Sequence, residues 1–304
     1  MAISRHQLVK ELEPGLNALF GLEYNRYDNQ HAEIYTSESS DRAFEEEVML
    51  SGFGNASVKS EGSGVAFDNA QESYSARYTH ETVALAFAIT EEAIEDNLYD
   101  RISSRYTKAL ARSMSNTKQV KAAAPLNNGL PSVDGFDSGD GVSLFNTSHT
   151  TVSGTSVKNT LTTQADLNET SLEQAMIDIA AMTDERGLRI AAKAVKMIVP
   201  SANQFEAERL MKSQGRVGTA DNDINALGSM GMIPQGYRVN NFLTDTDSFY
   251  IITDVPNGMK MFTRAPLTTA MEGDFDTGNV RYKARERYSF GVSDFRGIFG
   301  VEGA

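Results

Sequence analysis

Hydrophobic side chains alternate with small or charged ones in two segments of the chain. In VALAFAI (83–89), large apolar residues alternate with alanines. This period of two is typical of a strand that packs on one face, and the alanines indicate close approach of another segment on the other face. In NVRYKARERYSFGV (279–292), one face carries Val280, Tyr282, Ala284, Tyr288, Phe290 and Val292, and the other carries Arg281, Lys283, Arg285 and Arg287. Both segments are predicted to be strands.

A four-residue spacing of apolar side chains predicts one long helix that begins after Thr90. Its apolar stripe is Ile94, Leu98, Ile102, Tyr106, Leu110 and Met114. Thr90 is a good N-cap, and Pro125 is expected to end the helix. A helix of about 33 residues would be ~50 Å long, far above the mean of about 11–12 residues. Acidic residues precede basic ones along it, which complements the helix dipole. The segment is therefore predicted to be a strut.

Helix and strand patterns alternate in the middle of the chain. They comprise a helix in 167–187 capped by Thr170 with Glu173 and ended by Gly187, a strand at 194–199, a helix capped by Ser201 with Gln204, and strands at 237–243 and 248–254. The last two are expected to pair across the TDTD turn between them. The order helix, strand, helix indicates an α+β or α/β unit.

The first 80 residues contain few side chains that could form a core. Residues 1–46 look like an arm, with a short stripe of Leu8, Leu12, Leu16 and Leu19 that Pro14 is expected to interrupt. Residues 51–81 are rich in Gly, Ser, Ala and Asn, and loops of this length are usually disordered or functional. Alternation at Val65 and Phe67, and again from Tyr74 to His80, predicts a two-stranded ribbon. An isolated ribbon is marginally stable in water, so we expect it to lie on another copy of the chain.

Composition narrows the class of protein. The 304 residues include 28 Lys and Arg against 41 Asp and Glu, a net charge of −13. This balance argues against a protein whose main task is to grip nucleic acid, which needs clustered cations. It is compatible with a container whose inner wall repels its contents. The chain has no cysteine, so neither disulfides nor thiolate metal sites are available. No apolar run approaches the ~18 residues of a membrane span, and the first residues lack the apolar core of a signal peptide.

No constellation predicts an enzyme, a cofactor or a metal site. The histidines at 6, 31, 80 and 149 are scattered, and Ser148 beside His149 does not make a triad, whose members meet through the fold. The acidic turn DGFDSGDG spaces its aspartates by three, whereas an EF-hand places ligands at positions 1, 3 and 5. The glycine cluster at 228–231 lacks the Lys-Ser/Thr of a phosphate-binding loop.

The basic row at 281–287 is the strongest charged feature of the sequence. Nucleic-acid contact is one reading of it. Pairing with carboxylates, within or between subunits, is favoured because the protein as a whole is acidic. Glu45, Glu46 and Glu47 form a complementary block.

The order of these parts resembles the major capsid proteins of tailed bacteriophages. The similar segments are FAITEEAIEDNLYDRISSRYTKAL, SLFNTSHT, LNETSLEQAMIDIAAMTDERGLRI, MIVPSANQFEAERLMKS, NNFLTDTDSFYIITD and DFRGIFG. The likeness covers about residues 80–304, and the arm only by position. It implies an α+β phage major-capsid fold with an N-terminal arm, an extended β-hairpin loop, a peripheral domain with a long spine helix, and an axial domain.

The resemblance divides the chain into five parts. These are an arm (1–46), the extended loop and its strand (47–89), the spine helix (90–126), the axial domain with surface loops (127–266) and a C-terminal return to the peripheral domain (267–304). The loop would overlie a neighbouring subunit, and the axial domain would pack around five- and six-fold axes. Some members cross-link a loop lysine to a neighbour's asparagine. Lys59 and Asn279 have the right residue types, but nothing in the sequence shows them meeting.

We therefore expect a structural virion protein that self-assembles into hexamers and pentamers of an icosahedral capsid around double-stranded DNA. The resemblance implies a separate scaffolding protein, a portal, a decoration protein in some members, non-specific contact with packaged DNA, no membrane, and assembly in the host cytoplasm. A nanocompartment shell protein and a phage tail or surface binding protein remain alternatives. The candidate contacts between subunits are Glu45, Glu46, Glu47, Phe53, Lys59, Phe67, Tyr74, Tyr78, Arg281, Lys283, Arg285 and Arg287.

Overall fold

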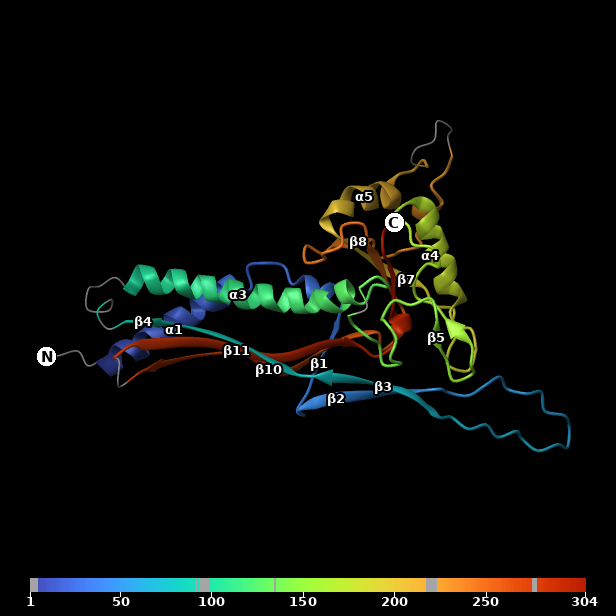
Figure 1. The fold of residues 1–304 in the computed structure, drawn as a ribbon, viewed down its shortest axis with the longest axis horizontal. Helices are drawn as coiled ribbons and strands as arrows, with labels where there is room; N and C mark the ends of the chain where they lie inside the picture. Colours follow the sequence, from blue (N-terminus) through green and yellow to red (C-terminus); the bar gives the residue numbers. More distant parts are fainter. Residues whose placement is uncertain (1–4, 91, 93–98, 134, 217–222, 275–277) are drawn as a thin grey trace.

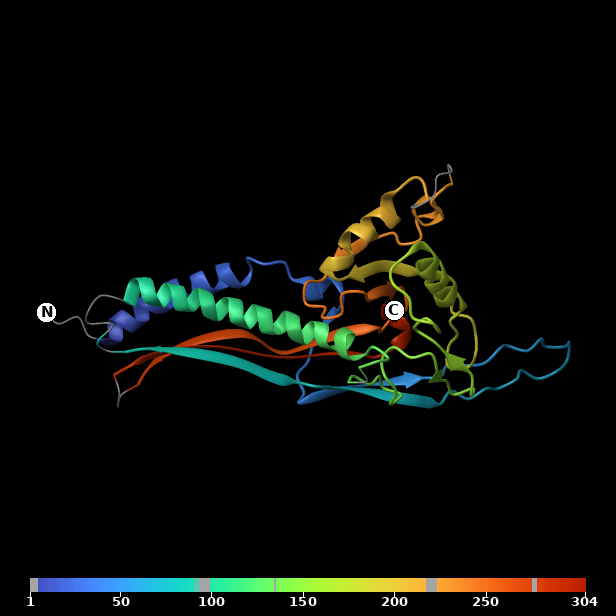
Figure 2. The same cartoon turned by 45° about the horizontal axis from the view of Figure 1, so that its top comes forward.

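Two four-stranded sheets divide the molecule into an elongated half and a compact half (Figure 1). The computed structural model describes residues 5–90, 92, 99–133, 135–216, 223–274 and 278–304. The elongated half contains the long helix and long strands. The compact half contains the shorter helices and the C-terminus, and a β-hairpin projects beneath it (Figures 1 and 2). This mixture of helices and strands confirms the α+β class.

The sheet of the elongated half confirms both predicted strands. Its order is β1 (Thr36–Ser39), β10 (Met259–Gly273), β11 (Val280–Val292) and β4 (Glu81–Ile89). β11 runs antiparallel to both neighbours, and β4 lies at the edge of the sheet. Alternation along β11 is also as predicted, because its apolar row is buried or half-buried and Arg281, Lys283 and Arg285 are exposed.

Helices α1 (Arg5–Tyr24) and α3 (Tyr99–Asn128) cover one face of this sheet (Figure 2). A small core joins the three layers, made of Leu16, Phe20, Leu110, Ala111, Met114, Tyr282 and Ala284. The opposite face of the sheet carries the exposed cations of β11. The predicted strut is confirmed from Tyr99 onward, while its predicted start after Thr90 falls on residues 91 and 93–98, outside the described residues.

Two prolines expected to end or interrupt helices lie inside them. Pro14 is within α1, and Pro125 is in the last turn of α3. A proline in a helix interior costs about 3 kcal/mol, whereas burial of one large apolar side chain contributes about 1.5–3 kcal/mol. Leu16 and Phe20 are buried after Pro14, and Leu126 is buried after Pro125. Packing therefore outweighs the local preference at both prolines.

The second sheet is the centre of the compact half. Its order is β12 (Ile298–Val301), β9 (Phe249–Thr253), β7 (Ala194–Val199) and β8 (Tyr237–Val239). The predicted strand at 194–199 is confirmed. The predicted pairing of the next two strands is wrong, because β8 and β9 each pair with β7 from opposite sides. β7 is an almost continuous apolar run, which favours a central strand covered on both faces.

Helices α4 (Glu169–Ala181), α5 (Gln204–Lys212) and α6 (Ala226–Met230) complete the compact half. The predicted caps are wrong in detail. Asn168 and Ser171 form the capping box of α4, which ends at Ala181, and no side chain caps α5, which follows a short 3-10 turn, η2 (Ser201–Asn203). In α4, Asn168 and Ser171 lie two residues before the predicted pair, Thr170 and Glu173. They accept hydrogen bonds from the free backbone N–H groups at the start of the helix, as the predicted pair was expected to do.

The hairpin consists of β2 (Phe44–Leu50) and β3 (Glu72–Thr79), paired antiparallel from Phe44 opposite Thr79 to Leu50 opposite Glu72. Residues 51–71, here called the distal loop, contain no strand. The predicted ribbon is thus confirmed at β3 and wrong at Val65 and Phe67. The remaining short elements are η1 (Gln30–Glu33), β5 (His149–Thr150), β6 (Ser156–Val157) and η3 (Phe295–Gly297).

Candidate assembly surfaces

The distal loop extends away from its own subunit (Figure 2). Phe53 is 62% exposed, Val58 and Phe67 are each 97% exposed, and Lys59 is also exposed. A single exposed apolar residue is normal on a protein surface, but several on one extended segment indicate a contact surface. The structure thus leaves three of the predicted contact residues, Phe53, Lys59 and Phe67, open to solvent.

Two other candidates, Tyr74 and Tyr78, pack inside the subunit in this structure, Tyr78 buried and Tyr74 half-buried, and their role as contacts between subunits stays a prediction. Tyr78 is 2% exposed, and its ring lies 4.8 Å from that of Phe262. A Cβ at Gly291 would lie 2.6 Å from the Tyr78 ring, so this contact needs glycine there. The ring of Tyr74 packs near Phe295. Aromatic residues with period two are expected on any half-buried strand, and the pattern alone does not say which subunit covers them.

The paired strands β2 and β3, here called the base of the hairpin, are joined to the compact half by a buried ionic network. Arg296 donates to Glu185 Oε1 at 2.6 Å, to Asp294 Oδ1 at 3.2 Å and to the Thr183 carbonyl at 2.8 Å. Glu185 Oε2 accepts from Ser73 Oγ of β3 at 3.0 Å. Burial raises the pKa of Asp294 above its usual range, although Arg296 opposes the shift. Removing one partner of such a pair leaves an uncompensated buried charge, which is strongly destabilising.

A second set of contacts, at Asp68, holds the two ends of the distal loop together. Asp68 Oδ1 accepts from Arg186 Nη2 at 2.8 Å, and Asp68 Oδ2 accepts from the Gly54 backbone N–H at 2.7 Å. The hydrogen bond from Gly54, followed by the one from Arg186, lowers the pKa of Asp68. Asp68 therefore connects the beginning of the loop, at Gly54, with its end. It also joins the loop to Arg186, the residue that follows Glu185.

The acidic block does not meet the basic row within the subunit. Glu46 pairs with Arg77 at 3.6 Å, Glu47 pairs with Lys260, and Glu45 accepts from Ser40. On the basic row, Arg281 pairs with Asp274 and Arg287 donates to the Ala43 carbonyl. Within the described residues, Lys283 and Arg285 have no ion pair. Pairing of the block with the row inside one chain is thus wrong, and pairing between chains stays a prediction.

A buried acid that the sequence analysis missed lies among the apolar residues of β11. Glu286 is buried, and its Oε2 lies 3.4 Å from Lys118 Nζ and 3.3 Å from Tyr24 OH. Burial raises the pKa of Glu286, while Lys118 opposes that shift. These contacts join α1, α3 and β11. The signal in the sequence was the single charge in the otherwise apolar face of this strand.

His31 also packs against α3 and is buried. Its backbone N–H donates to Gln119 Oε1 at 3.0 Å. Burial, together with the charge of Lys118, lowers the pKa of His31 to about 4. His31 is therefore neutral at physiological pH.

The described residues hold no group of three or more side chains suited to a metal ion. His149 is fully buried, stacked on Phe295 with ring centroids 3.9 Å apart, and held between Asp140 (2.7 Å) and Asn159 (3.1 Å). Both ring nitrogens face these partners, so His149 is a packing residue. Of the acidic turn, Asp134 lies outside the described residues, while Asp140 accepts from Ser138 and faces His149.

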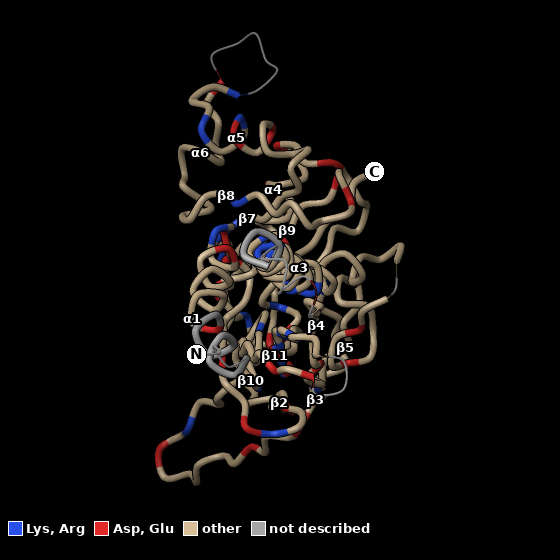
Figure 3. Tube along the Cα trace, turned by 90° about the vertical axis from the view of Figure 1, so that its left-hand side faces the viewer, with Lys and Arg blue, Asp and Glu red and all other residues tan. Residues whose placement is uncertain are grey.

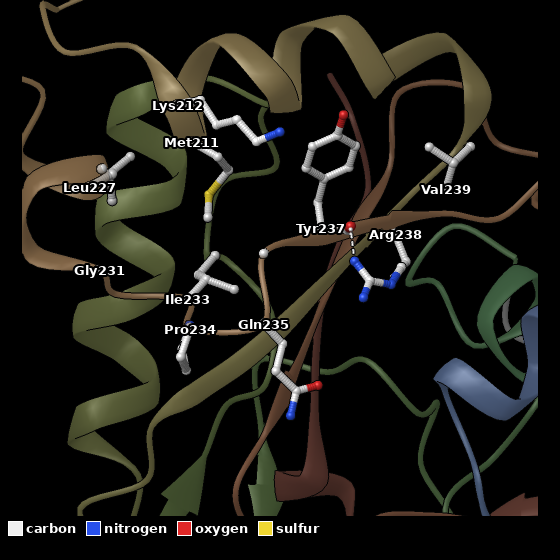
Figure 4. A pocket seen from close by; sticks show the side chains of 12 residues that line it. Met211, Lys212, Leu227, Gly231, Ile233, Pro234, Gln235, Tyr237, Arg238 and Val239 are labelled. Atoms are coloured by element: carbon white, nitrogen blue, oxygen red, sulfur yellow. Dashed lines mark hydrogen bonds between the residues drawn. The ribbon is translucent and has the colours of Figure 1, made fainter.

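One pocket, about 610 Å³ in volume, opens between α5, α6 and β8 (Figure 4). This volume would admit a small molecule. Within the described residues, most of its polar side chains are already engaged, with Gln235 the exception: Lys212 and Tyr237 both contact Glu208, at 2.8 and 2.9 Å, and Arg238 donates to the Tyr237 carbonyl. The pocket therefore offers apolar side chains such as Ile233 and few free polar groups that could orient a ligand.

Charges of both signs are interspersed over the two halves (Figure 3). No described helix combines the length and apolarity that crossing a bilayer requires. Two surfaces left open in the single subunit are the distal loop and the part of β11 that carries Arg281, Lys283 and Arg285.

Comparison with known proteins agrees with this arrangement. The phage capsid protein family matches residues 73–301. None of the curated proteins matches the chain. Among solved structures, the capsid of the Myoviridae phage XM1 has a TM-score of 0.55 at 13% identity and covers 89% of each chain.

Two further structures show the same fold. The capsid of an empty GTA particle has a TM-score of 0.53 at 16% identity, covering 90% of this chain and 89% of the other. A virus-like particle from Pyrococcus furiosus has a TM-score of 0.54 at 9% identity, covering 95% and 98%. The predicted phage major-capsid fold is thus confirmed, and the protein is a structural shell subunit rather than an enzyme. The chain belongs to the phage capsid protein family.

Proposed function

We propose that the chain forms the hexamers and pentamers of an icosahedral capsid that encloses double-stranded DNA and is assembled in the host cytoplasm. The observation that carries this proposal is the contrast within the hairpin. Its base is fixed in the subunit by Tyr78 and Glu185. Its distal loop is tied to the subunit through the pair of Asp68 with Arg186, but it leaves Phe67 97% exposed. A loop anchored in this way is suited to a contact that only another copy can supply.

In this proposal the elongated half is the peripheral domain and the compact half is the axial domain around the five- and six-fold axes. The distal loop would lie over a neighbouring subunit. Burial of one large apolar side chain contributes about 1.5–3 kcal/mol, so even a few loop residues add a substantial amount per subunit. The rigid strut α3 would keep the two halves at a fixed spacing.

The proposed contacts between subunits are Phe53, Lys59 and Phe67 of the loop, the acidic block Glu45 to Glu47, and the basic row of β11. A scaffolding protein, a portal and a decoration protein are proposed as partners from the family resemblance. A structure similar to this chain is the procapsid of bacteriophage JBD30, with a TM-score of 0.55 at 12% identity, covering 99% of this chain and 77% of the other. That similarity supports assembly through a precursor shell.

Deletion of residues 52–70, replaced by a short Gly-Ser turn, tests the proposal. The deletion spares β3, whose Tyr78 belongs to the core. We expect a soluble subunit with unchanged circular dichroism that forms no closed shells under conditions where the full chain does. Negative-stain electron microscopy is the readout. Normal shells from the deleted chain would contradict the proposed role of the loop.

A cellular nanocompartment shell is the second candidate, supported by the similarity to the virus-like particle from Pyrococcus furiosus. The two candidates differ in cargo. Particles purified from the natural source should contain nuclease-protected DNA if the chain is a capsid protein. Particles that contain a folded protein cargo and no nucleic acid would favour the nanocompartment. The family match favours either shell over a tail or surface binding protein.

A further inference from the structure

The proposed shell function leaves open which surface receives the distal loop. We propose that residues 63–67 of one copy pair, as an added strand, with the free edge of β4 in another copy. This inference rests on the shell function, since it requires two copies side by side.

The receiving edge is unusually open. β4 is the last strand of its sheet, and within the described residues it pairs with β11 alone. Natural edge strands are protected by charges, prolines or bulges. From Thr82 to Ile89, β4 has no charged residue or proline, and its register with β11 runs without a bulge. Its outward alanines are exposed, and Leu85 on the other face is 46% exposed.

The donor segment has strand character and no strand partner. Residues 63–67 read Ser-Gly-Val-Ala-Phe, with apolar side chains at alternate positions. Val65 is 69% exposed and Phe67 is 97% exposed. Among the described backbone hydrogen bonds, the one made by this segment joins the Ser63 N–H to the Ser60 carbonyl. The backbone groups from Gly64 to Phe67 are therefore available to pair with a strand edge.

The side chains of donor and edge fit in one orientation. With Val65 and Phe67 on the helix side of the sheet, they would lie beside Leu85 and near Tyr106 of α3, which is 52% exposed. Gly64 and Ala66 would then lie beside the alanines of β4. If the added strand were shifted by one residue, Phe67 would lie on the solvent face, because such a shift turns every side chain to the other face of the sheet.

Charge is compatible with the same arrangement. Residues 51–71 carry one lysine, Lys59, and two carboxylates, Glu61 and Asp68, of which Asp68 is already paired with Arg186 of its own subunit. The strand next to β4 carries the exposed basic row of β11, in which Lys283 lies opposite Ala86 and Arg285 opposite Ala84. An added strand would lie roughly 10 Å from that row, since neighbouring strands are about 4.7–4.9 Å apart. Glu61, two residues before the proposed strand, would thus lie on the same chain segment that approaches Lys283 and Arg285 of the neighbour.

The absence of cysteine from the chain makes a direct test possible. Ala66→Cys is introduced into a tagged chain, and Ala84→Cys, Ala86→Cys or Ala88→Cys into an untagged chain. The two chains are co-assembled and then oxidised. Opposed side chains on neighbouring strands have Cβ atoms about 4.5–5.5 Å apart, within or close to reach of a disulfide. We expect a dimer of one tagged and one untagged chain with at least one of the three alanine positions.

Val65→Cys in the tagged chain is the matched control, because its side chain would point to the opposite face. It should give at least tenfold less mixed dimer with the same partners. Particles that form without mixed dimer from Ala66→Cys, or with equal dimer from Val65→Cys, would overturn the inference while leaving the shell function intact. Failure of the unmodified chain to assemble under any condition would overturn both.

A second pair of variants covers the case in which the cysteines disturb assembly. Phe67→Ser should reduce the yield of particles at least tenfold without changing the melting temperature of the free subunit. Val58→Ser is the comparison, since Val58 is equally exposed and belongs to the same loop but lies outside the proposed strand, so its loss should lower the yield by a smaller factor. Equal yields from the two variants would overturn the inference.

Discussion

The base of the hairpin and the distal loop differ in what covers them, although they are adjacent in sequence. At the base, Tyr78 is buried against Phe262, and Ser73 bonds to the buried Glu185. In the loop, Phe67 and Val58 are almost fully exposed. The difference shows that an alternating pattern predicts that one face of a strand will be covered. Only the structure shows whether the same subunit covers it.

Truncation of an aromatic side chain in each region should give the sharpest contrast. Tyr78→Ala is expected to lower the free energy of unfolding by about 3–5 kcal/mol, because it leaves a cavity between the hairpin and the sheet. Phe67→Ala should leave the free energy of unfolding within about 0.5 kcal/mol, because its ring is exposed. Urea unfolding of the free subunits measures both. Equal losses of stability would contradict the distinction between base and loop.

Removal of the charge that anchors the base should have a similarly large effect. Arg296→Met is expected to cost about 3–5 kcal/mol, because Glu185 and Asp294 would be left buried without a cation. Arg209→Met is the control, since Arg209 forms only an exposed pair with Glu206 on the same helix. Thermal unfolding of the two variants should differ clearly. An Arg296→Met protein as stable as the control would show that the network does not hold the hairpin.

The pH dependence of stability tests the contact between the N-terminal segment and α3. His31 has a pKa of about 4 in the folded protein, against 6.5 for an unperturbed histidine, so the unfolded chain binds its proton first. Stability is therefore lost as the pH falls from 6.5 towards 4. Between about pH 7 and pH 5 this loss amounts to about 2 kcal/mol, and His31→Asn should abolish it. Parallel pH profiles of the original and variant chains would contradict the buried position of His31.

The smallest effect on stability is expected at the tie between Arg186 and Asp68. Because this pair lies at the surface, Arg186→Gln should not change the melting temperature measurably. It should release the two ends of the distal loop and speed tryptic cleavage after Lys59 in the free subunit. Arg189→Gln, an exposed arginine three residues away, is the control. Identical cleavage rates would show that Asp68 does not restrain the loop.

Sequence patterns predicted the elements whose burial is one-sided. β11 and β4 were identified by alternation, and α3 by its apolar spacing, because each packs one face on the same core. Predictions from local signals were less accurate. Pro14 and Pro125 lie inside helices because packing outweighs their local cost, and the TDTD turn does not join paired strands because β7 lies between β8 and β9.

The candidate contacts between subunits differ in what covers them within one chain. Phe53, Lys59 and Phe67 are exposed, as a contact with another copy requires, whereas Tyr78 is buried and Tyr74 half-buried in the subunit itself, and all five stay predictions. Arg296 carries buried charge that only the tertiary arrangement reveals, whereas Glu286 stands out in the sequence as the single charge on the apolar face of β11. A one-dimensional pattern gives the face of a strand to which a side chain belongs, but not the segment that will cover it.

Hydrogen exchange of the hairpin, measured in the free subunit and in assembled particles, tests the central claim most directly. The account predicts that the amides of β3 that bond to β2 are protected in both states, because Tyr78 and Ser73 hold β3 within one subunit. Amides of residues 52–70 should exchange rapidly in the free subunit and slow by at least tenfold in particles. Equally rapid exchange of the loop in particles would contradict the claim that another copy covers it.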